Sequence, residues 1–156
     1  MQTAFINSPL GIVSIVGDEN GISAISVFSN GSVSETIPIQ LQEAASQLKE
    51  YFGGNRKEFT FNINPIGTDF QQKVWRELLQ IPFGKTMSYL DLSKKLGDVK
   101  AIRAVASANG KNPLWIVVPC HRVIGTNGSL TGYAGGLWRK KWLLEHESPS
   151  AQQSLF

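Results

Sequence analysis

The dipeptide Cys120-His121 contains the residue types in this sequence best suited to covalent chemistry. A cysteine attacks as its thiolate, and an ordinary thiol with a pKa of about 8.5 needs help to lose its proton near neutral pH. A nearby histidine can take that proton directly or through one water, and a third group then orients the imidazole. Spacing leaves Glu147 and Asp91 both open for this third role. The same dipeptide also fits a buried structural cysteine beside a surface histidine, because neighbours on a strand point to opposite faces.

Cysteine usage and charge narrow the class of protein. Cys120 is the only cysteine among 156 residues, which excludes an intrachain disulfide and a cysteine-rich zinc site and favours a reducing, cytoplasmic compartment. No apolar run approaches the ~18 residues of a membrane span, and no secretory signal is visible. Residues 1–67 carry a net charge of −3 and residues 68–147 a net charge of +6. A basic lobe is expected of a protein that binds a polyanion, although ordinary solvated lysines give the same count.

Helices are expected to dominate the second lobe, residues 68–156. Thr68 followed by Gln71 has the pattern of a capping box at the start of a helix. Two further helices are expected over residues 88–97 and 99–109, and a helix pair joined by a tight, glycine-containing turn is a helix-turn-helix candidate.

The helix expected over residues 99–109 has two contrasting faces. At 100° per residue, an apolar face contains Val99, Ile102, Val105 and Ala106. The opposite face consists mostly of small side chains, and its members are Lys100, Ala101, Arg103, Ala104, Ser107 and Ala108. Small side chains allow the close backbone approach that a narrow minor groove requires. Packing against another helix of the same protein explains the pattern equally well.

Three further elements are expected around and after Cys120. Residues 116–119 predict a short buried strand that ends at a proline. The Asn127-Gly128 pair predicts a hairpin that joins residues 123–125 to residues 129–132, which after a helix-turn-helix would form a wing. A last helix is expected from Leu137 to His146, with Glu147 at its end.

The first lobe, residues 1–67, has the pattern of a β-meander with one helix, which makes the whole chain an α+β protein. Its expected strands are residues 3–6, 12–16, 22–28 and 59–63, and its expected helix is residues 41–52. Pro65-Ile66-Gly67 marks the boundary between the lobes. Nothing in this first lobe has a catalytic pattern.

The run Pro119-Cys120-His121-Arg122-Val123 resembles the active-site signature of the O6-alkylguanine-DNA alkyltransferases, also called methylated-DNA–protein-cysteine methyltransferases. The likeness extends over residues 68–147 almost without gaps, whereas the first lobe matches only in general layout. The other matching segments are Phe70-Gln71, Val74-Trp75, Ile81-Pro82-Phe83-Gly84, Ser88-Tyr89, Arg103-Ala104-Val105, Asn109-Gly110, Asn112-Pro113, Gly132-Tyr133-Ala134-Gly135-Gly136, Trp142-Leu143-Leu144 and His146-Glu147. The resemblance implies a ribonuclease H-like first lobe and a winged helix-turn-helix second lobe.

The resemblance also implies roles for individual residues. Cys120 would accept the alkyl group, His121 would take its proton through a water, and Glu147 would orient the imidazole. Tyr89 would donate a proton toward the departing guanine, and Asn112 would be the hinge between the recognition helix and the active-site strand. The implied DNA contacts are Arg103 as the finger that fills the vacated stack, and the small face of Ala101, Ala104, Ser107 and Ala108 in the minor groove. The implied base pocket consists of Pro119, Val123, Tyr133, Ala134 and Gly135, with Lys140 nearby.

The activity implied is DNA repair by irreversible transfer of an alkyl group from O6-alkylguanine, and from O4-alkylthymine, to Cys120. The nucleotide has to leave the duplex, at a cost of a few kcal/mol of unstacking. With no second cysteine to resolve the thioether, each molecule would turn over once. The implied partner is alkylated double-stranded DNA, bound by a monomer without cofactor, metal or membrane, and cooperative assembly on DNA stays open.

The sequence departs from the family pattern at a few positions, and other classes of function remain possible. Ala134 stands where some relatives have serine, which leaves the tolerated size of the alkyl group open, and the zinc-binding residues of some relatives' first lobes are absent. A non-catalytic module that binds the lesion, a winged-helix regulator and a Cys-His hydrolase remain alternatives. Methylation of Cys120 by damaged DNA would support the alkyltransferase function over these three alternatives.

Overall fold

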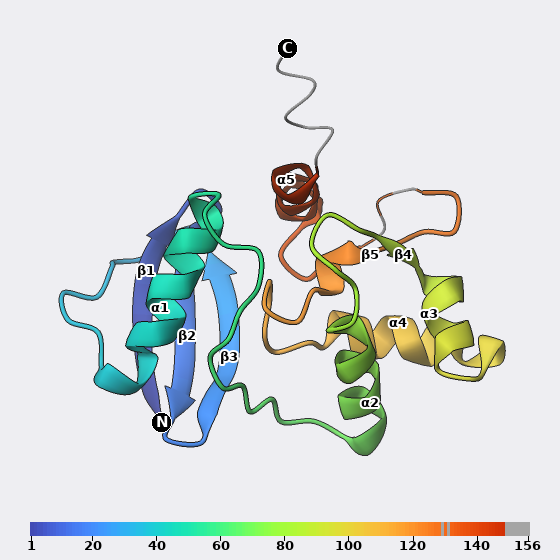
Figure 1. Cartoon of the computed structure of the whole chain (residues 1–156), viewed down its shortest axis with the longest axis horizontal. Helices are drawn as coiled ribbons and strands as arrows, with labels where there is room; N and C mark the ends of the chain where they lie inside the picture. The colour runs from blue at the N-terminus through green and yellow to red at the C-terminus, as the bar shows by residue number, and fades with distance from the viewer. Residues whose placement is uncertain (129, 131, 149–156) are drawn as a thin grey trace, which may run out of the picture. The chain divides into compact units, whose positions relative to one another are not determined.

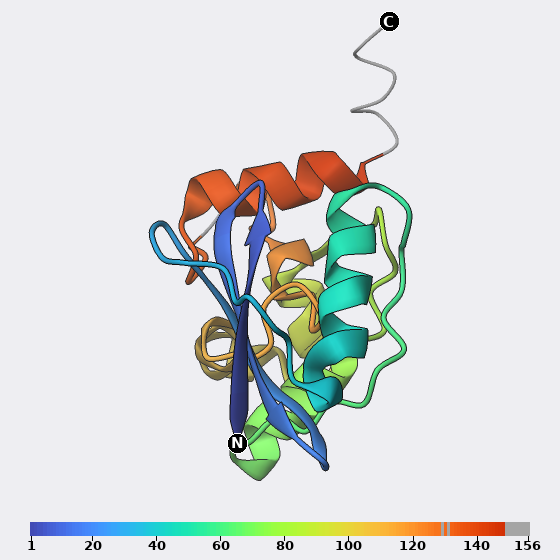
Figure 2. The ribbon, with the colours of Figure 1, turned by 90° about the vertical axis from the view of Figure 1, so that its left-hand side faces the viewer.

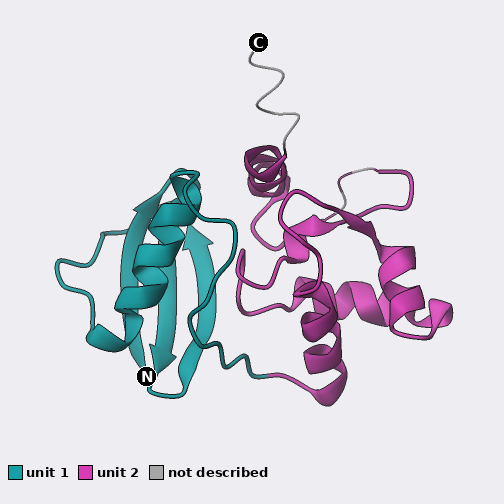
Figure 3. Cartoon of the chain, in the orientation of Figure 1, with its two compact units in different colours: residues 1–66 teal, residues 67–156 magenta. Residues whose placement is uncertain are grey.

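The computed structural model describes residues 1–128, 130 and 132–148 and divides the chain into two compact units, Met1–Ile66 and Gly67–Phe156 (Figure 3). The first unit is built on a small sheet and the second consists mainly of helices, which confirms the expected α+β class. No helix in the described part of the chain is long and apolar enough to cross a membrane.

The first unit is an antiparallel meander with one covering helix. Its strands are β1 (Gln2–Ser8), β2 (Gly11–Asp18) and β3 (Gly21–Phe28), in the order β1-β2-β3. Alternation along the strands buries one face of the sheet, which carries Ala4, Ile6, Val13, Ile15, Ile25 and Val27. Helix α1 (Ile39–Phe52) lies along the sheet in Figure 2 and contributes the buried side chains Leu41, Ala44, Ala45, Leu48 and Tyr51.

The prediction of a strand over residues 59–63 is wrong. Only an isolated parallel bridge forms there, between Ile22 and Ile63. The side chain of Gln47 on α1 replaces the ladder, because its Oε1 accepts from the backbone N–H of Thr60 at 2.8 Å and its Nε2 donates to the Thr60 hydroxyl at 2.7 Å. The Phe59 ring then lies 5.4 Å from the ring of Tyr51, so this segment packs through its side chains.

The second unit begins with the helices that the sequence predicts (Figure 1). Helix α2 (Asp69–Leu78) starts with the expected capping box between Thr68 and Gln71. Strand β4 (Met87–Ser88) precedes α3 (Tyr89–Lys95), whose first turn is capped by the Ser88 hydroxyl. A 3₁₀ turn (Val99–Ala101) leads into α4 (Ile102–Gly110), and α4 is tied to α2 by a 2.9 Å hydrogen bond from Trp75 Nε1 to the carbonyl of Ala108.

Two residues of the third predicted helix lie on other faces than expected. Val99, expected on the inner face, is 47% exposed, whereas Ala108, expected on the exposed small face, is 2% exposed. Val99 belongs to a 3₁₀ turn that Asp98 caps through the N–H of Lys100. Ala108 lies one turn after the buried Val105 on α4, and its carbonyl accepts from Trp75 on α2, so it belongs to the packed face. The expectation for Ala108 as a surface residue is therefore wrong in this structure.

The wing expected over residues 123–132 lies partly outside the described residues. Strand β5 (Val123–Ile124) pairs in parallel with β4. A turn does form at the Asn-Gly pair, where the N–H of Gly128 donates to the carbonyl of Gly125 at 2.8 Å. The second strand of the expected hairpin includes residues 129 and 131, which lie outside the described residues. Helix α5 (Leu137–Glu147) closes the unit.

Candidate active site

Cys120 lies at the start of a 3₁₀ turn, Cys120–Arg122, that leads directly into β5. The residues before it do not form the expected strand 116–119, and that expectation is wrong. Asn112 folds this loop instead, because its Nδ2 donates to the carbonyl of Val118 at 2.8 Å and its Oδ1 accepts from the N–H of Leu114 at 2.9 Å. Ile116 takes a positive φ of 75° within the resulting turns. The loop delivers Cys120 into the interior, where it is only 4% exposed.

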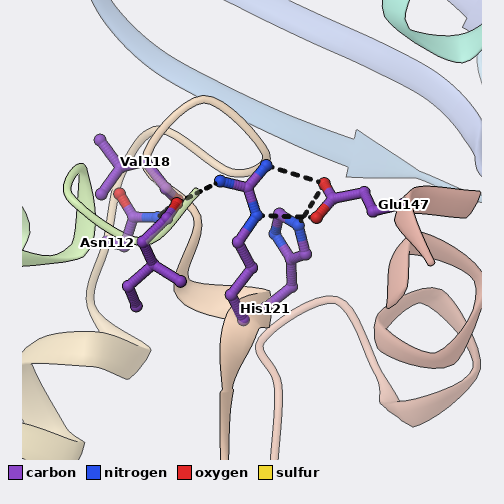
Figure 4. A network of polar contacts seen from close by, with 6 residues as sticks. Asn112, Val118, His121 and Glu147 are labelled. Atoms are coloured by element: carbon purple, nitrogen blue, oxygen red, sulfur yellow. Dashed lines mark hydrogen bonds and ion pairs between the residues drawn. The ribbon is translucent and has the colours of Figure 1, made fainter. Parts of the chain in front are cut away.

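The carboxylate of Glu147, at the end of α5, joins two consecutive residues of the active-site turn. Its Oε2 lies 2.8 Å from Nε2 of His121, and its Oε1 accepts from Nε of Arg122 at 2.7 Å. Figure 4 shows the His121 imidazole facing this Glu147 carboxylate. All three side chains are buried. The 2.8 Å contact identifies Glu147 as the carboxylate that orients His121. Asp91, the other candidate, is exposed on α3.

The protonation states of this group follow from its burial and charges. Burial would raise the pKa of Glu147, but the hydrogen bonds and positive charges of His121 and Arg122 outweigh it and lower that pKa to about 2. Burial lowers the pKa of His121 below its usual 6.5, and this effect exceeds the opposing pull of Glu147. At neutral pH the group therefore contains a carboxylate and a neutral imidazole.

The tautomer of His121 is fixed by the same contacts. An ionised carboxylate only accepts hydrogen bonds, so Nε2 must carry the hydrogen that faces Glu147. Nδ1 then keeps its lone pair, and this buried atom has no hydrogen-bond partner among the described residues. The site thus holds an oriented proton acceptor on the residue that follows Cys120.

The thiol of Cys120 is stored in its neutral form. Burial raises its pKa to about 11, while the Asn112 amide, the Lys140 charge and a backbone hydrogen bond partly oppose this shift. Lys140 is itself fully buried and donates from Nζ to the carbonyl of Val123 at 2.6 Å. A cation and an amide donor thus lie where they favour the thiolate as soon as its proton is removed.

A turn before α5 brings another part of the predicted pocket to the site. The N–H of Gly136 donates to the carbonyl of Tyr133 at 2.9 Å, and Arg139 donates to the carbonyl of Gly135 at 3.0 Å. A Cβ on Gly135 would lie 2.8 Å from the Tyr133 ring and 3.2 Å from the ring of Trp115, so only glycine fits there without a shift. Burial raises the pKa of Tyr133, and the charge of Cys120 adds to that shift.

The predicted residues divide into a connected group and a separate surface. Contacts or electrostatic coupling join Cys120, His121, Glu147, Asn112, Tyr133 and Lys140, and Tyr89 joins through an amide contact described below. Pro119 and Val123 directly flank the active-site turn and are buried, and Ala134 is exposed in the turn before α5. On α4, Arg103, Ala104 and Ser107 are exposed, and Ala101, in the 3₁₀ turn before α4, is half-buried. Among the described residues, no group of three or more His, Cys, Asp or Glu side chains could hold a metal ion.

Two residues of the site were quoted in motifs but given no role by the sequence analysis. Arg122 holds Glu147 with two nitrogens and also donates from Nη1 to the carbonyl of Ile81 at 2.6 Å. A charged residue within the apolar stretch around Cys120 was the available signal. Asn109 donates from Nδ2 to the hydroxyl of Tyr89 and to the carbonyl of Cys120, both at 3.4 Å. Its position at a helix end gave no sign of these contacts.

Comparison with known proteins gives matches in both units of the chain. Residues 69–149 match the family described as 6-O-methylguanine DNA methyltransferase, DNA binding domain, and residues 1–65 match its ribonuclease-like domain. The chain is 44% identical over 154 residues to a protein of Methanosarcina acetivorans named methylated-DNA–protein-cysteine methyltransferase, covering 94% of this chain and 98% of that one. A Mycobacterium tuberculosis protein of the same name is 43% identical over 155 residues, covering 96% and 94% of the two chains.

Solved structures agree with these sequence matches. The M. tuberculosis protein OGT in complex with DNA superposes with a TM-score of 0.86 at 41% identity, covering 96% of each chain. The M. tuberculosis O6-methylguanine methyltransferase gives a TM-score of 0.84 at 38% identity and covers 99% of each chain. Both lobes and their order are thus accounted for by one family, and this chain belongs to the 6-O-methylguanine DNA methyltransferases.

Proposed function

We propose that this protein repairs alkylated DNA by moving the alkyl group from O6 of guanine, and from O4 of thymine, to the sulfur of its own Cys120. The observation that carries the proposal is the contact between His121 and Glu147 at 2.8 Å directly beside a buried cysteine. It leaves a neutral imidazole whose unprotonated nitrogen can serve as a base. Family membership and the DNA complex of the M. tuberculosis relative support DNA as the substrate.

The thiol proton moves to His121 when substrate is bound. Nδ1 of the imidazole accepts it through a water, and Glu147 stabilises the imidazolium that results. The pKa of Cys120 at about 11 keeps the sulfur protonated in the resting protein, which protects it from other electrophiles. Lys140 and Asn112 favour the thiolate once the proton has left.

The transfer exchanges one covalent bond for another. The thiolate attacks the alkyl carbon, the carbon–oxygen bond breaks, and its electrons remain with the base. Tyr89 donates its hydroxyl proton to a ring nitrogen of the departing guanine, which lowers the cost of the leaving anion. The product on the protein is a thioether. Because Cys120 is the only cysteine in the sequence, no second thiol is available to resolve it, and each molecule acts once.

The alkylated base reaches Cys120 only after it leaves the duplex. The exposed part of α4 contains Ala104 and Ser107, whose small side chains suit close approach to a minor groove. Arg103, also exposed on α4, enters the stack and fills the place of the extruded nucleotide. The turn of Tyr133, Ala134 and Gly135, together with Pro119 and Val123, forms the walls that receive the base.

Mass spectrometry of the intact protein tests the proposal. After incubation with duplex DNA that contains O6-methylguanine, the mass should increase by one methyl group, and peptide mapping should place it on Cys120. Cys120→Ser is the control, because a hydroxyl is a far poorer nucleophile near neutral pH, and this variant should bind the DNA without gaining mass. Tight binding by the unsubstituted protein with no change in mass would instead identify a lesion-binding module.

A further inference from the structure

We propose that Asn109 is a positioning residue that holds the hydroxyl of Tyr89 ready to protonate the departing base. This inference rests on the proposed function and adds to it a residue on α4. Asn109 is 4% exposed and is the last residue but one of that helix. It therefore connects the helix that carries Arg103 to the residue proposed to protonate the base and to the residue proposed to accept the alkyl group.

The contacts of Asn109 fix the orientation of its amide. Nδ2 lies 3.4 Å from the carbonyl oxygen of Cys120 and 3.4 Å from the hydroxyl oxygen of Tyr89. A backbone carbonyl can only accept, so the nitrogen, and not the oxygen, must face Cys120. The same nitrogen then presents its second hydrogen to Tyr89. The Cys120 carbonyl thus determines that Asn109 is a donor toward Tyr89.

The orientation of the amide determines what Tyr89 can do. Because its oxygen accepts from Asn109, its own hydrogen points elsewhere and is available for a substrate atom. When Tyr89 gives that proton to the base, negative charge develops on its oxygen, and the N–H of Asn109 stabilises that charge. Tyr89 recovers a proton from solvent after transfer, while the proton taken from Cys120 leaves through His121, so the protons balance.

A purely structural role fits the amide less well. Oδ1 of Asn109 is buried and has no hydrogen-bond partner among the described residues. A buried acceptor without a hydrogen-bond partner lowers the free energy of unfolding, so this orientation of the amide, with Nδ2 toward Tyr89, costs stability. Unsatisfied groups of this kind call for an explanation, and a contact used during the reaction supplies one.

A double-mutant cycle on methyl transfer from O6-methylguanine duplex DNA tests the inference. Asn109→Ala should slow transfer roughly tenfold, a size typical of a lost positioning contact. In the Tyr89→Phe background, Asn109→Ala should cause no further loss, because the hydroxyl on which it acts is absent. An equal loss in both backgrounds, or no loss in the unsubstituted one, would overturn the inference. Asn109→Leu, which keeps the side-chain volume, repeats the cycle, and Lys111→Ala, an exposed neighbour on the same segment, should leave the rate unchanged.

The rate at which iodomethane methylates Cys120 separates a positioning role of Asn109 from a structural one. A structural defect at Cys120 would slow this reaction too, whereas loss of a contact to Tyr89 would not. The iodide leaves without a proton, so transfer from iodomethane to Cys120 does not need Tyr89. Asn109→Ala should therefore react with iodomethane within about twofold of the unsubstituted protein. A loss as large as that with DNA would show that Asn109 supports Cys120 itself and would overturn the inference. If Cys120 of the unsubstituted protein is methylated by iodomethane but never by damaged DNA, the proposed function is wrong, and the inference is wrong with it.

Discussion

Arg122 and Glu147 form a two-pronged ion pair, in which Nε donates to Oε1 at 2.7 Å and Nη2 donates to Oε2 at 3.1 Å. The second of these oxygens is also the one that contacts His121. The guanidinium therefore holds the plane of the carboxylate on which the orientation of the imidazole depends. Because Nη1 donates to the carbonyl of Ile81 as well, one arginine links the active-site turn to the end of α5 and to the segment after α2.

Arg122→Lys should therefore reduce both stability and reaction rate. A single ammonium cannot reproduce the planar fork, so part of this buried pair is lost, and we expect the free energy of unfolding to fall by about 2 kcal/mol. Looser placement of His121 should slow methyl transfer by roughly tenfold. Urea titration and single-turnover kinetics measure the two effects. Arg56→Lys is a matched control, since Arg56 makes a partly exposed pair with Glu50 at 3.5 Å, and we expect a loss below about 0.5 kcal/mol.

Acid should destabilise the protein through the same buried group. The folded-state pKa of His121 lies below its usual 6.5, so the stability it contributes is complete above about pH 6.5 and is lost as pH falls toward its folded value. Glu147 acts in the same direction at lower pH, because its pKa is about 2 when folded and about 4.5 when unfolded. Its share, roughly 3 kcal/mol, is present above pH 4.5 and is lost between pH 4.5 and 2.

The acid dependence can be measured by denaturant unfolding at a series of pH values from 7 to 2. Glu147→Gln removes the second titration, so its free energy of unfolding should change less with pH between 4.5 and 2 than that of the unsubstituted protein. Equal slopes for the two proteins in that range would contradict the assignment of this acid sensitivity to Glu147.

The capping residues of the second unit show which parts of the fold follow from local sequence. Thr68 with Gln71 forms the cap that its spacing predicts, and the Ser88 hydroxyl likewise caps α3 through the N–H of Asp91, because the interacting groups lie within one helical turn. The strand predicted over residues 116–119 was wrong because the Asn112 side chain hydrogen-bonds to the backbone of this segment and stabilises a turn in place of a strand. An apolar run alone does not reveal that competition.

The candidate site shows the same division between local and distant interactions. Cys120 and His121 were identified from adjacent residues and from the family signature, but spacing alone could not choose between Asp91 and Glu147. That choice depends on how α5 packs, and Glu147 lies 26 residues from His121 along the chain. Asn109 and Tyr89, 20 residues apart, meet for the same reason. Their contact requires the packing of α3 against α4, which no local pattern encodes.

The reactivity of Cys120 in the DNA-free protein should rise with pH well beyond the range of an ordinary thiol. With a pKa of about 11, the thiolate fraction, and so the rate of alkylation by iodomethane, should increase about tenfold for each pH unit between 7 and 10. Lys140→Met removes a charge that lowers this pKa, so the rate at pH 8 should fall several-fold. A rate that levels off below pH 9 would contradict the raised pKa, and mass spectrometry of the alkylated protein provides the measurement.

Arg103→Ala should impair repair of duplex DNA far more than reaction with a free base. Only the duplex has a vacated stack to fill, so we expect a loss of at least about tenfold with O6-methylguanine in duplex DNA and little change with free O6-benzylguanine. Lys100→Ala is the matched control, because it removes an exposed positive charge from the turn just before α4. If Arg103 acts only by attracting phosphates, the two variants should lose the same activity, and both losses should shrink in the same way as salt is varied. Single-turnover rates on the two substrates at several salt concentrations separate a finger that enters the stack from a surface charge.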